Sequence, residues 1–300
     1  MRNRIKTREK QERTTRQELK TFDARLTPLL QQFFDEEANA VPPAAKDMVT
    51  RLRKFCLRGG KRLRPYLTHT SYQLFGGKNE NSALAMSIVP ELIHNFLLIH
   101  DDVMDQSNIR RGEPTMHKVY EADIAGDNAA HFGESMAILS GDLLYTLAGQ
   151  AINKVPVTPD KKWRIWQITQ HAVRQTIFGQ ELDLQQSQQK KVASDETLTM
   201  YQYKTAYYSF DAPLRIGAVL ANAKENDIEW ISEYAIPCGI AFQLIDDALD
   251  GETQLPAREL AQTYITQAQN ALAEFTGDHF DQEAKQKLSA LADFVAKRER

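Results

Sequence analysis

Two runs of three aspartates share the spacing Asp-Asp-x-x-Asp within otherwise apolar stretches. They are Asp101, Asp102 and Asp105 in LLIHDDVMD, and Asp246, Asp247 and Asp250 in FQLIDDALD. On a helix, the first and third acid of a run lie about 40° apart, and the second lies about 100° from the first. Each run therefore presents a cluster of carboxylates from one helical face.

Clustered carboxylates raise one another's pKa values unless a cation neutralises them. A ligand set made of oxygen favours a hard ion such as Mg²⁺, which prefers to share its coordination shell with phosphate oxygens. Two clusters that face each other across a cavity would hold a phosphorylated substrate. The alternative is a pair of solvated helix faces, but the residues before the acids, 93–99 and 240–245, are too apolar for surface helices.

Helices are expected to position these acids, because helical periodicity dominates and no convincing run of alternating strand residues occurs. The fold class predicted is all-α. Breaks follow from Pro42 and Pro43, from the turn at Gly76 and Gly77, and from the segment 155–160. The predicted helices are 14–36, 43–57, 62–75, 82–104, 132–153, 160–189, 195–222, 227–250, 256–275 and 281–298.

The chain has 300 residues, 42% of them hydrophobic, which suits a packed globular core. No linker separates two domains, so one bundle (residues 1–300) is expected to bring the acidic runs together. A net charge of −3 argues against a nucleic-acid binder. Cys56 and Cys238 show no metal-ligand spacing and are expected to be buried thiols in a reducing compartment.

The first residues, 1–20, are basic and are expected to form a solvated helix or tail, with contact to an anionic membrane as the alternative. They contain no apolar region of a secretory signal. No stretch approaches 18 uncharged apolar residues, so stable membrane insertion is not expected. A soluble, cytoplasmic protein is predicted.

Three basic segments could bind phosphate: GGKRLRP at 59–65, IRRG at 109–112 and YKTA at 203–206. Arginine can bind phosphate oxygens through two parallel hydrogen bonds, and lysine acts as a point charge. Each segment alone is more typical of a solvated basic surface. Together with the two acidic runs, they indicate a site for diphosphates.

From about residue 55 to 250, the sequence resembles the trans-prenyl diphosphate synthases, the polyprenyl synthetase family, and specifically the short-chain farnesyl and geranylgeranyl type. The resemblance rests on GGKRLRP, on ELIHNFLLIHDDVMD with the following NIRRGEPTMH, and on AILSGDLL, FGQELDL, YKTA and GIAFQLIDDALD in the family's order. It implies the isoprenoid synthase fold, a single large helical bundle around a central cavity. It also implies a homodimer.

The resemblance assigns roles residue by residue. About three Mg²⁺ ions would be bound by Asp101, Asp102, Asp105, Asp246, Asp247 and Asp250. Arg110 and Lys204 would contact the allylic diphosphate (dimethylallyl, geranyl or farnesyl). Isopentenyl diphosphate would be bound by Lys61, Arg64, His94 and Arg111. Thr205 and Gln243 would lie near the bond that ionises, and Gln180 and Asp183 would line the same wall.

Two histidines near the first run need separate interpretation. His94 lies seven residues before Asp101 and so shares its helical face, which favours a phosphate role over that of a core residue. His100 directly precedes the acids, points elsewhere and is interpreted as structural.

The implied reaction ionises the allylic diphosphate, and isopentenyl diphosphate then attacks the resulting carbocation and loses a proton. Phe96 lies five residues before Asp101, about 7.5 Å along the helix. An aromatic ring there would close the bottom of the cavity, which the resemblance associates with farnesyl or geranylgeranyl products. Leu97 is mid-sized and leaves room for the longer product. The alternative is that Phe96 is an ordinary core residue.

The sequence departs from the family pattern at two places. After Asp250, some tens of residues with a diphosphate-binding lysine do not occur; we favour a mobile loop that is absent from this chain over a true deletion. The segment 121–131 looks inserted and is expected at the rim of the site. The alternatives to an active synthase are an inactive regulatory subunit and a terpene cyclase of the same fold.

Overall fold

The computed structural model describes residues 2–189, 193–251, 253, 255–277 and 279–297, with side chains from residue 13 onward. The predicted all-α class is confirmed. The helices are α1 (Arg2–Ala40), η1 (Pro43–Ala45), α2 (Lys46–Cys56), α3 (Leu63–Leu74), α4 (Glu80–Met104), α5 (Met116–Glu121), α6 (Ala129–Lys154), α7 (Pro159–Gln186), α8 (Ser194–Tyr201), η2 (Gln202–Asp211), α9 (Ala212–Leu220), α10 (Glu225–Asp250), α11 (Ala257–Glu274) and α12 (Gln282–Ala296).

The predicted helices begin and end close to the observed ones, with three differences. The first helix is longer than predicted and begins at Arg2, so the basic start continues α1. The single helix predicted for 195–222 is divided into α8, η2 and α9, and η2 is a π-helix. A short hairpin, β1 (Ile109–Arg110) with β2 (Glu113–Pro114), and helix α5 were not predicted. Residue 298, at the end of the last predicted helix, lies outside the described residues.

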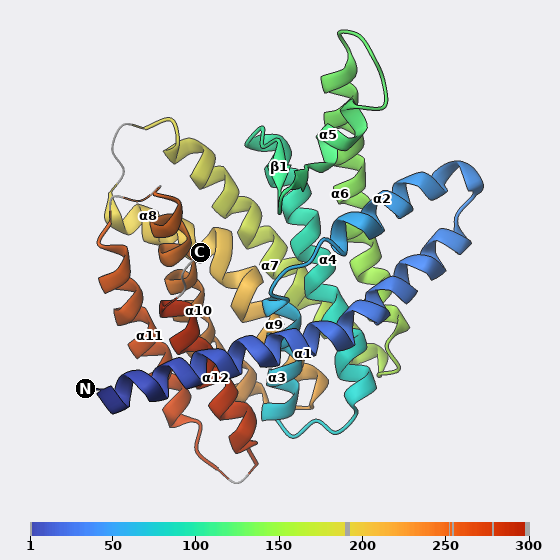
Figure 1. The fold of residues 1–300 in the computed structure, drawn as a ribbon. Coiled ribbons are helices and arrows are strands. Elements are labelled where there is room, and N and C mark those ends of the chain that lie inside the picture. Colours follow the sequence, from blue (N-terminus) through green and yellow to red (C-terminus); the bar gives the residue numbers. More distant parts are fainter. Residues whose placement is uncertain (1, 190–192, 252, 254, 278, 298–300) are drawn as a thin grey trace.

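Helices α4 and α10 carry the two acidic runs, and both pack against η2 in one bundle, with α1 lying across α3 and α12 (Figure 1). Helix α4 begins where the Asn79 side chain accepts a hydrogen bond of 3.0 Å from the backbone N–H of Ser82. By length and composition α4 could cross a membrane, but 78% of its apolar window is buried, as in a core helix. Cys56 and Cys238 are buried free thiols, as predicted.

The segment 121–131 links α5 to α6 and stands out from one end of the bundle (Figure 1). None of its residues lines the central cavity. The prediction that it forms the rim of the site is therefore wrong. The reason is that the segment leaves the end of α5 and returns to the start of α6 outside the bundle.

The π-helix η2 lies between two close backbone contacts. A Cβ atom added at Gly179 of α7 would lie 2.1 Å from the backbone nitrogen of Lys204. One added at Gly239 of α10 would lie 2.4 Å from the Cα atom of Ala206. Because both neighbouring helices present glycine, η2 can approach them with its own backbone. Such wide turns occur frequently at functional sites.

Gly179→Ala is expected to lower the free energy of unfolding by about 1–3 kcal/mol, because the new methyl group would displace the backbone of η2. Chemical denaturation measures the change. The matched control is Gly149→Ala on α6, where the added Cβ atom would lie 3.6 Å from the Trp166 ring, an ordinary contact distance. That control should be neutral or stabilising, since alanine favours helices. Equal effects of both substitutions would contradict the close contact at η2.

Candidate active site

A central cavity of about 1450 Å³ contains almost the whole predicted site. It exceeds the usual volume of a pocket for one small ligand, which is about 300–1,000 Å³. The predicted residues that line it are Lys61, Arg64, His94, Phe96, Asp101, Asp105, Arg110, Arg111, Gln180, Lys204, Thr205, Gln243, Asp246, Asp247 and Asp250. The two that do not line it are Asp102 and Asp183. The cavity can therefore receive two ligands between the acidic runs.

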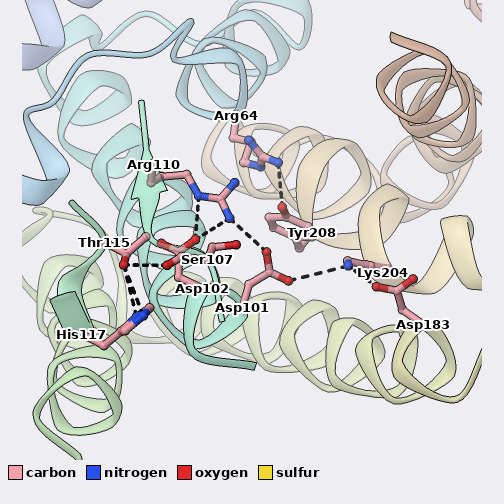
Figure 2. A network of polar contacts seen from close by, with 10 residues as sticks. All are labelled: Arg64, Asp101, Asp102, Ser107, Arg110, Thr115, His117, Asp183, Lys204 and Tyr208. Atoms are coloured by element: carbon pink, nitrogen blue, oxygen red, sulfur yellow. Dashed lines mark hydrogen bonds and ion pairs between the residues drawn. The ribbon is translucent and has the colours of Figure 1, made fainter. Parts of the chain in front are cut away.

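Arg110 of the β-hairpin contacts the first acidic run (Figure 2). Its guanidinium donates to Oδ1 of Asp102 at 2.8 and 2.5 Å and to Oδ2 of Asp101 at 3.3 Å. Burial disfavours the charge of Arg110, but these carboxylates outweigh it and raise its pKa. Asp102 is fully buried, and burial raises its pKa despite this partner. Asp102 thus positions Arg110 beside the cavity.

The hairpin itself is attached to the end of α2 by a residue that was not predicted. Arg58 donates to the carbonyl of Pro114 at 2.6 Å and lies 3.1 Å from a carboxylate oxygen of Glu113. Its guanidinium also lies over the Phe55 ring, 4.9 Å from the centroid. These contacts fix β2 and, through its pairing with β1, the hairpin that carries Arg110 and Arg111. A lone arginine before two glycines gives no pattern by which the sequence could have shown this.

Lys204 of η2 lies between the first run and α7 (Figure 2). Its Nζ atom donates to Asp183 at 2.5 Å and lies 3.6 Å from Asp101. Burial opposes the ammonium charge, but the two carboxylates outweigh it and raise the pKa. Lys204 is therefore charged and faces the point where Arg110 also meets Asp101.

A chain of hydrogen bonds orders the second run. The Thr205 hydroxyl donates to Gln243 at 2.6 Å, and the Gln243 amide donates to Asp247 at 2.6 Å. The hydroxyl of Tyr201, a residue not predicted, donates to the other oxygen of Asp247 at 2.5 Å. Burial raises the pKa of Asp247, and these two donors partly offset it. Both oxygens of Asp247 thus accept bonds from protein groups.

The opposite wall of the cavity is basic. Arg64 donates to the Tyr208 hydroxyl at 2.8 Å and to the Ser209 hydroxyl at 2.7 Å. Burial lowers the pKa of Arg111, and the nearby guanidinium groups of Arg62 and Arg64 add to this. Lys61 is exposed at the same wall. Positive groups that disfavour one another's charge form a site for an anion.

His94 faces this basic wall, and its buried Nδ1 atom makes no hydrogen bond. Burial and the nearby charge of Arg64 hold its pKa well below the usual 6.5. His100, interpreted as structural, contacts the Phe96 ring edge-on at 5.0 Å, and its Nε2 atom lies 3.1 Å from the carbonyl of Ile138. It nevertheless lines the cavity.

The lowered pKa of His94 predicts a pH effect on stability. Below about pH 6.5, histidine binds protons in the unfolded chain while His94 stays neutral in the folded one, so the free energy of unfolding falls. Burial raises the pKa of Asp211, which acts in the opposite sense. The test therefore compares wild type with His94→Gln by urea denaturation at about pH 7.5 and 5.5. The variant should lose less stability on acidification, and an equal loss would contradict the assignment.

The donor set suits a magnesium ion that shares its shell with substrate. Among the described residues, no three carboxylate, imidazole or thiol groups stand close enough to hold a metal ion alone. Mg²⁺ is usually bound by one or two carboxylates together with substrate phosphates, so a closed protein cage is not needed. The carboxylates that line the cavity are Asp101, Asp105, Asp246, Asp247 and Asp250. They fit this requirement.

Comparison with known proteins agrees with this geometry. The polyprenyl synthetase family matches residues 46–257. The chain is 36% identical to the short chain isoprenyl diphosphate synthase of Methanocaldococcus jannaschii over 219 residues, which cover 73% of this chain and 62% of that protein. It is 38% identical to the geranylgeranyl diphosphate synthase of Methanosarcina mazei over 192 residues, 64% of this chain and 55% of that protein. The chain thus spans less than two thirds of these relatives.

Solved structures confirm the predicted isoprenoid synthase fold. Geranylgeranyl pyrophosphate synthase from Corynebacterium glutamicum, complexed with isoprenyl diphosphate and magnesium, superposes with a TM-score of 0.85 at 24% identity and covers 94% of this chain and 99% of that one. The geranylgeranyl pyrophosphate synthetase from Pyrococcus horikoshii gives a TM-score of 0.77 at 25% identity, covering 97% and 99%.

Proposed function

Because the chain belongs to the polyprenyl synthetase family, we propose that it is a prenyltransferase that condenses isopentenyl diphosphate with an allylic diphosphate to give a short-chain trans-prenyl diphosphate. One observation carries the proposal: two acidic runs and a basic wall line one cavity large enough for two diphosphates. The two relatives are named as a short chain isoprenyl diphosphate synthase and a geranylgeranyl diphosphate synthase, which supports a short-chain product.

The acidic runs and the basic wall each bind a different substrate. The allylic diphosphate lies between the acidic runs, where Arg110 and Lys204 already point at Asp101. Isopentenyl diphosphate lies at the wall formed by Lys61, Arg64, His94 and Arg111. Mg²⁺ ions, about three in number, are bound by the cavity-lining carboxylates and stabilise the negative charge of the departing diphosphate.

The protein's own groups lower the barrier to ionisation by electrostatic stabilisation. Arg110 and Lys204 are kept charged by their carboxylate neighbours, so they are directed at the developing charge without reorganisation. The Thr205 and Gln243 dipoles lie at the carbon that becomes positive. Asp183 accepts a hydrogen bond from Lys204 and so positions it, and Gln180 lines the same wall. No side chain here serves as a general base, and the released diphosphate takes the proton.

The hydrocarbon tail extends from the acids toward Phe96, where water must be excluded. Phe96 lines the cavity and is otherwise buried. Its ring closes the lower end and limits the product to farnesyl or geranylgeranyl length.

A homodimer of one domain, residues 1–300, completes the proposal. Helices α6 and α7 expose large apolar side chains, which mark interaction surfaces when they gather. They are Ile138, Leu139, Trp163, Ile177, Phe178 and Leu184. Ile177 and Phe178 also line the cavity, so a second copy on this face would exclude water from it. Light scattering after gel filtration tests the mass.

Incubation of purified protein with Mg²⁺, isopentenyl diphosphate and each allylic primer separates the candidate functions. Elongated diphosphates would support the proposal, cyclic hydrocarbons would indicate a cyclase, and absence of product would indicate a regulatory subunit.

Removal of Mg²⁺ by a chelator is expected to abolish elongation, because two diphosphates and the acidic runs leave an uncompensated negative charge. Product chromatography with and without excess Mg²⁺ measures the loss. Full activity in the presence of chelator would reject the metal assignment, whereas rescue by added Mg²⁺ shows that the protein stayed folded.

A further inference from the structure

The lower end of the cavity is formed by three helices, not by α4 alone. On the side of the cavity where the hydrocarbon tail would extend, each helix has one lining residue that lies farthest from the acids. This residue is Phe96 on α4, Tyr145 on α6 and Gln170 on α7. We call Phe96, Tyr145 and Gln170 the floor. Two of these three residues come from outside the helix that carries the first acidic run.

The floor residues contact one another directly. The rings of Phe96 and Tyr145 pack with centroids 5.3 Å apart and planes tilted by 45°. On its other side, Tyr145 packs against Trp166 of α7 at 5.6 Å. The Gln170 side chain interacts with the Tyr145 hydroxyl. Tyr145 is thus the residue that joins all three helices at this level.

Space beyond the floor depends on Tyr145 more than on its neighbours. The next residue on the same face of α6, four positions further, is Gly149, which has no side chain to close the cavity. The Trp166 ring covers this position, 3.6 Å from where a Cβ atom of residue 149 would lie. Below Phe96, by contrast, α4 continues with the buried side chains Leu92 and Ile93. Removing the Tyr145 ring therefore opens space as far as the Trp166 ring, whereas removing the Phe96 ring leads to the packed side chains of α4.

We propose that Tyr145 determines product length together with Phe96, the two rings acting as one floor for the growing tail. The inference rests on the proposed prenyltransferase function. Phe96 alone blocks only the α4 side, so a chain that reaches the floor in Phe96→Ala still meets the Tyr145 ring. In Tyr145→Ala the tail can enter the space that the ring leaves between Phe96 and Trp166.

The test compares product lengths from four variants with isopentenyl diphosphate and a dimethylallyl primer. Tyr145→Ala should shift the main product to longer chains by about one five-carbon unit or more, and the double variant with Phe96→Ala should shift it further than either single change. Tyr145→Phe is the matched control: it keeps the ring, removes the hydroxyl and should leave the length unchanged.

The outcomes separate this inference from the proposed function. If wild type elongates the primer and Tyr145→Ala gives wild-type lengths, the role of Tyr145 is rejected and the function stands. A length change in Tyr145→Phe equal to that in Tyr145→Ala would also reject the ring as the cause. Absence of elongation by wild type rejects the function itself. Melting curves identify a folding failure, in which case Tyr145→Leu, which keeps an apolar side chain of shorter reach, takes the same test.

Discussion

Asp246→Asn is expected to lower kcat/KM for elongation by about 10²–10³-fold, the usual effect of removing one group that stabilises transition-state charge. Asp246 is the first acid of the second run, lines the cavity and lies on α10 opposite the first run. Asparagine keeps the shape and removes the charge that binds Mg²⁺. The variant should also need a higher Mg²⁺ concentration for half-maximal activity.

The matched control for Asp246→Asn is Glu229→Gln, which removes one negative charge from an exposed position of the same helix. It should leave both kcat/KM and the Mg²⁺ requirement unchanged. An Asp246→Asn enzyme with wild-type activity and Mg²⁺ dependence would remove the second run from the metal site.

Arg62→Ala is expected to lower the free energy of unfolding by about 3–5 kcal/mol, because it leaves a buried charge without its partner. Arg62, 3% exposed, pairs with Glu91 of α4, 2% exposed, and with Asp23 of α1 at 3.0 Å. Urea denaturation measures the change. This pair joins the first helix of the chain to the helix that carries the first acidic run.

Two further variants show whether the loss comes from the unpaired charge. Arg164→Ala removes an arginine from an exposed ion pair with Glu225 and should cost at most about 1 kcal/mol. Removing both buried charges, as in Arg62→Met with Glu91→Met, should recover much of the stability, since apolar replacements of buried pairs are often neutral. A double variant as unstable as Arg62→Ala would assign the loss to packing.

Helix spacing predicted that each run presents its acids from one helical face. Helix geometry places the second acid of a run about 100° from the first. In the structure the second acids, Asp102 and Asp247, accept hydrogen bonds from Arg110 and from Tyr201 with Gln243. The first and third acids of both runs line the cavity, and so does Asp247. Local periodicity was therefore sufficient for the acids, because it depends only on the helix.

Features that depend on contacts between distant segments were not predictable from the sequence. The π-helix at η2 arises where Gly179 and Gly239 of two other helices approach its backbone, and its residues have no distinctive local pattern. The floor needed Tyr145 of α6, which lies forty-nine positions after Phe96, directly after the segment AILSGDLL, and no local pattern shows its contact with Phe96. Arg58 and Tyr201 likewise act through partners far along the chain.

The close main-chain contacts of η2 with α7 and α10 also restrict which substitutions this protein can accept. A helix that rests on two neighbouring main chains leaves no room for any larger residue at positions 179 and 239, and mutations there cannot be absorbed by a change of rotamer. Directed evolution should accept variation freely among the side chains at the far end of the cavity and reject it at these two positions. Variants with a new product length can then be selected without loss of the ability to ionise the allylic diphosphate.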